Sequence, residues 1–109
     1  SSIFGVVSRE KRSMYSASKS ALLGLTRASA LDLSKHNVLV NSVSPGFVNT
    51  SLTRKILGKK GMKNIIKEIP IKRMATTKDI SNLIIFLCSN YNSYITGQNF
   101  IIDGGVTCK

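Results

Sequence analysis

The sequence predicts an α/β fold with a parallel sheet, and three features indicate it. Apolar residues recur at three- and four-residue spacing across residues 15–34, which is the period of an amphipathic helix with one buried face. Residues 38–43 follow as a short run rich in β-branched side chains, which is typical of a buried strand. Residues 99–102 are similar and predict a last strand. A helix that leads directly into a strand of this kind suggests a βαβ unit, and hence parallel strands.

The boundaries of these elements follow from the residues beside them. Cationic and turn-forming residues at 35–37, among them His36, are expected where the first helix stops. Pro45 and Gly46 predict a turn after the strand at 38–43. Asp79 is expected to start another helix, capped by Thr76 or Thr77 and ended by residues 90–93. Residues 103–105 read as a turn that closes the last strand.

The segment between residues 50 and 77 differs from the rest in composition. It holds eight of the 16 basic residues and two glycines but only one acidic residue, Glu68. Residues 52–56 and 62–66 are expected to form short helices within a mobile insertion over the edge of the sheet. The basic side chains are Arg54, Lys55, Lys59, Lys60, Lys63, Lys67, Lys72 and Arg73.

Composition narrows the classes of function without choosing one. The 109 residues carry a formal net charge of +11, which favours acidic partners such as nucleotides, phosphorylated substrates, acidic proteins or nucleic acid. No stretch approaches the roughly 20 apolar residues of a membrane span. Cys88 and Cys108 match no metal-binding spacing, so no metal site is expected. We expect both thiols to be reduced in a cytoplasmic protein.

Tyr15 and Lys19 are the first candidates for chemistry. Side chains four residues apart lie on one face of a helix, one turn above the other. A nearby ammonium stabilises a phenolate and brings a tyrosine toward the range in which general acid–base catalysis is efficient. Taken alone, the pair is better explained by a surface tyrosine and lysine that fall at this spacing.

Other motifs surround this pair in a fixed order. They are Ser2, the stretch Asn41-Ser42-Val43-Ser44-Pro45-Gly46-Phe47-Val48-Asn49-Thr50, and Ile95-Thr96-Gly97-Gln98 followed by Asp103-Gly104-Gly105. Together the motifs resemble the classical short-chain dehydrogenase/reductase family over essentially all 109 residues. The closest pattern is that of 3-oxoacyl-[acyl-carrier-protein] reductase-like members, with relatives that act on sugars or polyols. The resemblance implies the C-terminal part of a doubly wound Rossmann-type parallel sheet, with the last strands and helices only.

The resemblance also implies roles for three residues. Ser2 would polarise the substrate carbonyl or hydroxyl, with Ser1 as the neighbour that could be mistaken for it. Tyr15 would exchange a proton with that oxygen while hydride moves between the substrate carbon and NAD or NADP. Lys19 would support Tyr15 and hold the nicotinamide ribose. The implied reaction interconverts an alcohol and a ketone.

A second set of residues would bind the cofactor beside the nicotinamide. Pro45, Gly46, Val48 and Thr50 match the family's loop there, in addition to Tyr15 and Lys19. Gly46 would allow close backbone approach, Val48 would offer backbone hydrogen bonds, and Thr50 a hydroxyl near the carboxamide or pyrophosphate. Without the resemblance, the proline and glycine would indicate only a tight turn. Asn41 is expected to have a structural role in its strand.

Two interpretations of the basic segment stay open. Residues 54–73 occupy the family's substrate-binding loop, where they would form a lid that attracts an acidic carrier protein or a phosphorylated sugar. Alternatively they form a solvated lysine-rich surface. A different class of function, a basic module that binds nucleic acid or another partner without catalysis, is disfavoured because aromatic residues are not interleaved with the basic ones.

Several family features have no match in the sequence. The glycine-rich turn that cradles pyrophosphate and the residue that separates NAD from NADP are both missing. We therefore expect residues 1–109 to be the C-terminal catalytic portion of one domain whose N-terminal nucleotide-binding portion is absent. We expect this portion to be inactive alone, because its sheet edge and apolar faces would be uncovered. The intact protein is expected to be a homodimer or homotetramer.

Overall fold

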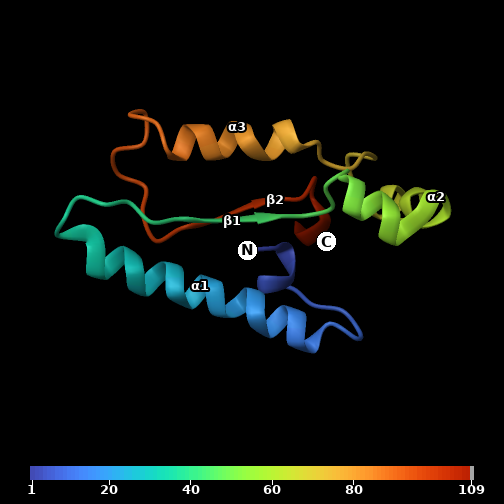
Figure 1. The fold of residues 1–109 in the computed structure, drawn as a ribbon, viewed down its shortest axis with the longest axis horizontal. Coiled ribbons are helices and arrows are strands. Elements are labelled where there is room, and N and C mark those ends of the chain that lie inside the picture. Colours follow the sequence, from blue (N-terminus) through green and yellow to red (C-terminus); the bar gives the residue numbers. More distant parts are fainter. Residues whose placement is uncertain (109) are drawn as a thin grey trace.

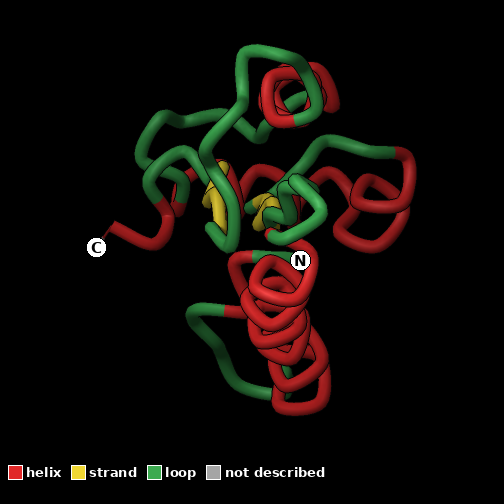
Figure 2. The backbone as a smooth tube through the Cα atoms, turned by 90° about the vertical axis from the view of Figure 1, so that its left-hand side faces the viewer, coloured by secondary structure: helices red, strands yellow, loops and turns green. Residues whose placement is uncertain are grey.

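The computed structural model describes residues 1–108. Its elements run in the order η1 (Ile3–Gly5), α1 (Ser13–Ser34), β1 (Ser42–Pro45), α2 (Ser51–Glu68), α3 (Thr77–Leu87), β2 (Asn99–Ile102) and η2 (Val106–Cys108). The strands β1 and β2 pair in parallel as a two-stranded sheet. Figures 1 and 2 both show this sheet between α1 on one side and α3 on the other. The α/β fold with parallel strands is therefore confirmed.

The strand β1 begins and ends later than the sequence predicted. Residues 38–41 lie outside the ladder because β2 starts only at Asn99, opposite Ser42. Pro45, predicted to lie in a turn, is the last residue of β1 and pairs with Ile102. The Ser42 and Gly46 amides donate toward the β2 side. Successive backbone N–H groups of a strand point to opposite edges, so the Pro45 nitrogen faces the edge away from β2. The N–H group that proline lacks therefore removes no hydrogen bond from the β1–β2 ladder.

The segment before η1 runs beside the free edge of β1. The Ser1 nitrogen donates to the Val43 carbonyl across 2.9 Å, on the edge of β1 opposite β2. Residues 1 and 2 have no regular strand assignment, although their place beside β1 is that of a neighbouring strand. Asn41 has the structural role expected of it, since its side chain donates to the Ile95 carbonyl and accepts from the Gln98 amide.

The helix α1 confirms the predicted periodicity but not the predicted burial. It begins at Ser13, two residues early, and ends at Ser34, with the His36 amide bonded to Leu33 beyond its end. Only Ala30 of this helix is buried, and Leu31 is 77% exposed. The prediction of a buried helix face is wrong for the described residues, because the two-stranded sheet covers little of α1.

The basic segment is helical over most of its length, as the two predicted short helices indicated. The 18 residues of α2 extend from Ser51 to Glu68, interrupted at Gly58, whose φ of 62° and ψ of 178° break the helical path. The two predicted patches fall on either side of this break. Residues from this segment supply the main buried cluster, which consists of Ile65, Ile69 and Met74. Six of the eight basic side chains lie on α2, which packs against this cluster through residues such as Ile65.

The helix α3 begins two residues before the predicted start and uses the predicted cap. The Thr76 hydroxyl accepts from the Asp79 amide, and the Asp79 carboxylate accepts from the Thr76 amide, which completes a capping box. Arg73 forms an ion pair with the same carboxylate at 2.8 Å. The Arg73 hydrogen bond, followed by those from Thr76, holds the pKa of Asp79 well below its ordinary value.

The described residues leave much apolar surface exposed. The radius of gyration is 15.3 Å, whereas a compact domain of this length is expected near ~13 Å. Large hydrophobic side chains on α1 and α3 are more than one third exposed. These include Met14, Leu22, Leu25, Ile84, Ile85 and Phe86. Within the described residues no helix is long and apolar enough to span a membrane, and both cysteines are free thiols.

Candidate active site

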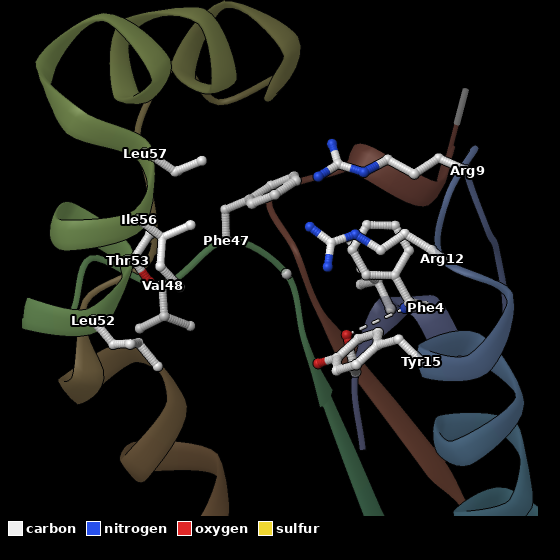
Figure 3. Close-up of a pocket in the computed structure, with 13 residues that line it drawn as sticks. Phe4, Arg9, Arg12, Tyr15, Phe47, Val48, Leu52, Thr53, Ile56 and Leu57 are labelled. Atoms are coloured by element: carbon white, nitrogen blue, oxygen red, sulfur yellow. Dashed lines mark hydrogen bonds between the residues drawn. The ribbon is translucent and has the colours of Figure 1, made fainter.

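A cleft of about 330 Å³ lies between the start of α1 and the loop that follows β1 (Figure 3). One wall comes from residues 2–4 and the first turn of α1, and the opposite wall from residues 46–48 and one face of α2. Its lining residues are Ser2, Ile3, Phe4, Arg9, Arg12, Tyr15, Gly46, Phe47, Val48, Leu52, Thr53, Ile56 and Leu57. Residues from four separate parts of the chain thus meet at one site.

The segment that carries Ser2 is fastened to α1 near Lys19. The Ser1 hydroxyl donates to the Lys19 carbonyl at 3.1 Å, and the Ser20 hydroxyl donates to the Gly5 carbonyl at 2.9 Å. Gly5 packs so closely that an added Cβ would lie 3.0 Å from the Lys19 carbonyl oxygen. These contacts fix the position of the segment relative to the helix that carries Tyr15.

Ser2 is the serine that faces the cleft. Its side chain accepts a hydrogen bond from the Phe4 amide at 3.2 Å, and the residue is only 8% exposed. A hydroxyl that accepts one bond still has its own proton to donate. Ser1 does not line the cleft, and its hydroxyl is occupied by the Lys19 carbonyl. Ser2 can therefore donate to an oxygen of a bound molecule where Ser1 cannot.

Tyr15 and Lys19 lie one above the other on α1, as their spacing predicted. The Lys19 Nζ lies 5.3 Å from the centroid of the Tyr15 ring. On the other side of Tyr15, the Phe4 ring makes an edge contact at 6.1 Å and 74°. In Figure 3 the Tyr15 ring extends into the space that faces Val48. Its position is thus set by an aromatic neighbour and a cation, with its hydroxyl end toward the cleft.

Gly46 makes the closest backbone contact of the opposite wall. An added Cβ would lie 2.8 Å from both Cα and Cβ of Asp103. Asp103 holds the next turn, since its carboxylate accepts from the Gly105 and Thr107 amides. Burial opposes ionisation of Asp103, but these hydrogen bonds outweigh it and lower the pKa. The glycine is required here by close packing against a structured turn.

Val48 lies in the cleft wall and has a backbone amide without a hydrogen bond within the described residues. Val48 and Ala75 form an isolated parallel β-bridge. Its two hydrogen bonds run from the Ala75 amide to the Phe47 carbonyl and from the Asn49 amide to the Ala75 carbonyl. The amide and carbonyl of Val48 therefore point away from Ala75. The carbonyl accepts from the Thr50 amide, whereas the Val48 amide has no hydrogen bond to a described residue. It is a donor available to a ligand.

Pro45 and Thr50 lie on the other side of the same loop. Both line a neighbouring cavity of about 290 Å³, which also includes Val48. The Thr50 side chain caps α2 by accepting from the Thr53 amide at 3.1 Å. Five of the six predicted cofactor-binding residues thus line two adjoining cavities, with Val48 common to both, whereas Lys19 lines neither.

Sequence reasoning missed the charged and apolar parts of the cleft. None of the eight basic residues between 54 and 73 lines it. Its charge comes instead from Arg9 and Arg12, and α2 contributes apolar side chains such as Leu52 and Ile56. The four-residue spacing of the latter pair was a signal for a helix face, and Arg12 stands one turn before Tyr15. No group of three or more potential metal ligands occurs in residues 1–108.

Comparison with known proteins gives consistent matches over almost the whole chain. The family model described as enoyl-(acyl carrier protein) reductase matches residues 1–107. A trans-4-hydroxycyclohexanecarboxylate dehydrogenase of Sinomonas cyclohexanicum is 46% identical over 107 residues, which are 98% of this chain and 39% of that protein. A 3-oxoacyl-[acyl-carrier-protein] reductase of Buchnera aphidicola is 41% identical over 105 residues, or 96% of this chain and 43% of that protein.

A solved structure agrees with the fold. A 4-hydroxyisoleucine dehydrogenase complexed with NADH superposes with a TM-score of 0.93 at 38% identity, covering 100% of this chain and 45% of that one. The chain therefore spans less than half the length of the proteins it matches. Within that span, the arrangement of helices and strands is the same.

Proposed function

The chain belongs to the short-chain dehydrogenase/reductase family, and from this premise we propose that it forms the catalytic portion of an NAD(P)-dependent oxidoreductase. The substrate is an alcohol or a ketone, and Tyr15 is the general acid/base. One observation carries the proposal: Ser2 and Tyr15 line one cleft, while the Lys19 ammonium stacks against the Tyr15 ring. A surface tyrosine and lysine of coincidental spacing would not need Ser2 beside them.

The three side chains divide the chemistry of alcohol oxidation. The Tyr15 phenolate takes the hydroxyl proton as the carbon–oxygen double bond forms and the carbon loses hydride. The Ser2 hydroxyl donates to the same substrate oxygen and orients it. Lys19 stabilises the negative charge on Tyr15 from the turn below. In the reductive direction, Tyr15 returns the proton to the carbonyl oxygen.

The chain's own residues fit a nicotinamide cofactor. The Val48 amide is a free donor at the cleft, which suits a carboxamide oxygen, and Gly46 keeps that loop close to the sheet. Pro45 and Thr50 extend the same wall into the adjoining cavity. When bound, NAD or NADP accepts or supplies the hydride. The choice between the two is not assigned to any residue of this chain.

We also propose that residues 1–109 are the C-terminal portion of a single domain. The exposed apolar faces of α1 and α3 would be covered by further strands and helices or by another subunit, since parallel sheets are normally covered on both faces. Turnover would require the glycine-rich cofactor turn, so this portion alone is expected to be inactive. A homodimer or homotetramer is the expected assembly.

The substrate class is a small or carrier-linked alcohol or carbonyl compound. The relatives named above include a dehydrogenase of a cyclic hydroxy acid and a reductase of carrier-bound 3-oxoacyl groups. Both names describe a hydroxyl or oxo group on a carbon chain or ring. That shared chemistry, and neither particular substrate, is what we extend to this protein.

The test is turnover by the full-length protein that contains these residues. Secondary alcohols are supplied with NAD or NADP, and reduced nicotinamide and ketone are measured together. We expect equal amounts of the two products. Ser2→Ala should lower kcat by about 10²–10³-fold, the loss typical of one donor to a developing oxyanion.

Ser1→Ala is the matched control, because it removes a neighbouring hydroxyl that contacts Lys19 and not the cleft. It should change kcat by less than about tenfold, well below the loss typical of a group that acts on the reacting oxygen. A full-length protein that binds neither coenzyme and oxidises no alcohol would contradict the proposed function.

A further inference from the structure

Two arginines form the charged part of the cleft wall. Arg9 and Arg12 both line the same cavity as Tyr15. Figure 3 shows their side chains extending from the Tyr15 side of the cleft toward the space in front of Phe47. No Asp or Glu of the described residues lines this cavity, so the charged side chains in its wall are all cationic.

Both arginines lie close to Tyr15, Arg9 through its contact with Phe4 and Arg12 through its place at the start of α1. The Arg9 guanidinium carbon lies 5.4 Å from the centroid of the Phe4 ring, and the same ring touches the edge of Tyr15. Arg12 is the N-cap residue of α1, three residues before Tyr15, and its side chain lines the same cavity. Both arginines are exposed at the mouth of the cleft, and Arg9 is linked to Tyr15 through the Phe4 ring.

Within residues 1–108, neither arginine forms a salt bridge with an Asp or Glu side chain. The ion pair of residues 1–108 lies elsewhere, between Arg73 and Asp79. Glu10, between the two arginines in the sequence, forms no ion pair with either of them within the described residues. The turn between them places Lys11 at a φ of 60°, in the left-handed region. The third cation of this loop does not line the cavity.

The remaining walls of the cleft are apolar. Phe4 and Phe47 contribute rings, and α2 contributes aliphatic side chains including Leu52 and Ile56. A molecule that fits this cleft has an apolar body, an oxygen near Ser2 and Tyr15, and a negatively charged end. Guanidinium groups match carboxylates in particular, because two parallel N–H donors meet two oxygens in one plane.

We propose that Arg9 and Arg12 form an anion-binding site that holds a carboxylate of the substrate, so that the enzyme acts on hydroxy acids or oxo acids. The inference rests on the proposed function, since it names the substrate class of the same cleft. In this proposal the anion binds to the loop before α1 and not to the lysine-rich face of α2. The two arginines would select and orient the substrate while Tyr15 exchanges the proton.

The experiment measures binding and does not require turnover. The full-length protein is titrated calorimetrically with succinate, glutarate, adipate, cyclohexanecarboxylate and glycerol 2-phosphate, and with the amides of the four carboxylic acids, with and without NADH. At least one acid should bind at least about tenfold more tightly than its amide, since hydrogen bonds to charged groups are the stronger ones. Arg9→Gln and Arg12→Gln should each weaken binding of that acid about tenfold to a hundredfold, with little effect on the amide or on NADH.

Lys11→Asn is the matched control. It removes one positive charge from the same loop, and asparagine tolerates the left-handed backbone at this position. Acid binding should change by no more than about twofold, because screened surface charges contribute little. Arg12→Lys keeps the charge but loses the planar fork, so its affinity for the acid should fall between those of the wild type and Arg12→Gln.

Three results would overturn the inference. Acids that bind no better than their amides would exclude a carboxylate site. Equal losses of affinity for the acid in Lys11→Asn and in the arginine variants would show that only the net charge of the loop matters. Tighter binding of glycerol 2-phosphate than of every carboxylate would replace the carboxylate with a phosphate. In each case coenzyme-linked oxidation of neutral alcohols would still show whether the proposed function stands.

Discussion

Replacing Gly46 with alanine should damage stability and activity together. The new Cβ would lie 2.8 Å from Asp103, whereas ordinary van der Waals contact begins near 3.4 Å. The loop must therefore move by about 0.6 Å, the difference between these two distances. Gly46 also donates to the Ile102 carbonyl at 2.8 Å, so movement away from Asp103 strains the bond that ends the β1–β2 ladder.

The expected size of this effect follows from what is typical of overpacked sites. Overpacking at a site of this kind typically costs about 1–3 kcal/mol of the free energy of unfolding. Val48 lies two residues further along in the cleft wall, so a shift of the loop also displaces its amide. Misplacement of about 1 Å can cost as much as about 10²-fold in rate, and we expect kcat/KM to fall at least about tenfold.

Urea unfolding and kcat/KM of the full-length protein test this prediction. Gly24→Ala is the control, because no described atom lies within 4 Å of its added Cβ and alanine favours a helix by about 0.8–1.0 kcal/mol. Gly24→Ala should raise the urea midpoint, while Gly46→Ala lowers it. A Gly46→Ala protein with unchanged midpoint and unchanged kcat/KM would refute the reasoning.

Two further predictions concern stability. Ile69 is 2% exposed in the cluster under α2, so Ile69→Ala should lower the free energy of unfolding by about 2–5 kcal/mol; a loss below about 1 kcal/mol in urea unfolding would contradict its place in the core. Asp79 has a lowered pKa in the folded protein, so its contribution to stability is present above its ordinary pKa of 3.8 and is lost as the pH falls below that value. Wild type should therefore exceed Asp79→Asn in urea midpoint at neutral pH and approach it in acid, whereas a constant difference would exclude this linkage.

Much of the fold could be predicted because its signals are local. The helical period of α1, the Thr76 cap of α3 and the strand Asn99–Ile102 were each encoded within a few residues. The spacing of Tyr15 and Lys19 likewise fixed their relation on one helix face. In each case a short-range rule of backbone geometry sufficed.

The errors arose where the outcome depends on distant partners. The start of β1 is set by the start of β2, because Ser42 pairs with Asn99. The sequence of residues 38–43 alone contains no information about that partner. The sequence indicated two short helices in the basic segment but not the buried cluster that they help to form, which includes Ile65, Ile69 and Met74. Predicted burial of α1 was wrong for the same reason, since exposure depends on which elements cover it.

The candidate site was predictable in its family motifs and unpredictable in its charge. Ser2, Tyr15, Gly46 and Val48 were expected and line one cleft. Arg9 and Arg12 belong to no motif, and only the turn at Lys11 and the start of α1 bring them to the same wall. One of the two open interpretations placed the attraction for an anion in the lysine-rich segment, whose basic side chains do not line the cleft.

The most direct test of the central claim is the rate of hydride transfer in Tyr15→Phe. Tyr94→Phe removes the same hydroxyl from a side chain that is 94% exposed and outside the cleft. With saturating coenzyme and substrate, the account predicts that Tyr15→Phe loses about 10²–10⁴-fold in kcat while still binding NAD or NADP, and that Tyr94→Phe keeps the wild-type rate. Wild-type turnover in the Tyr15→Phe protein would contradict the assignment of the general acid/base.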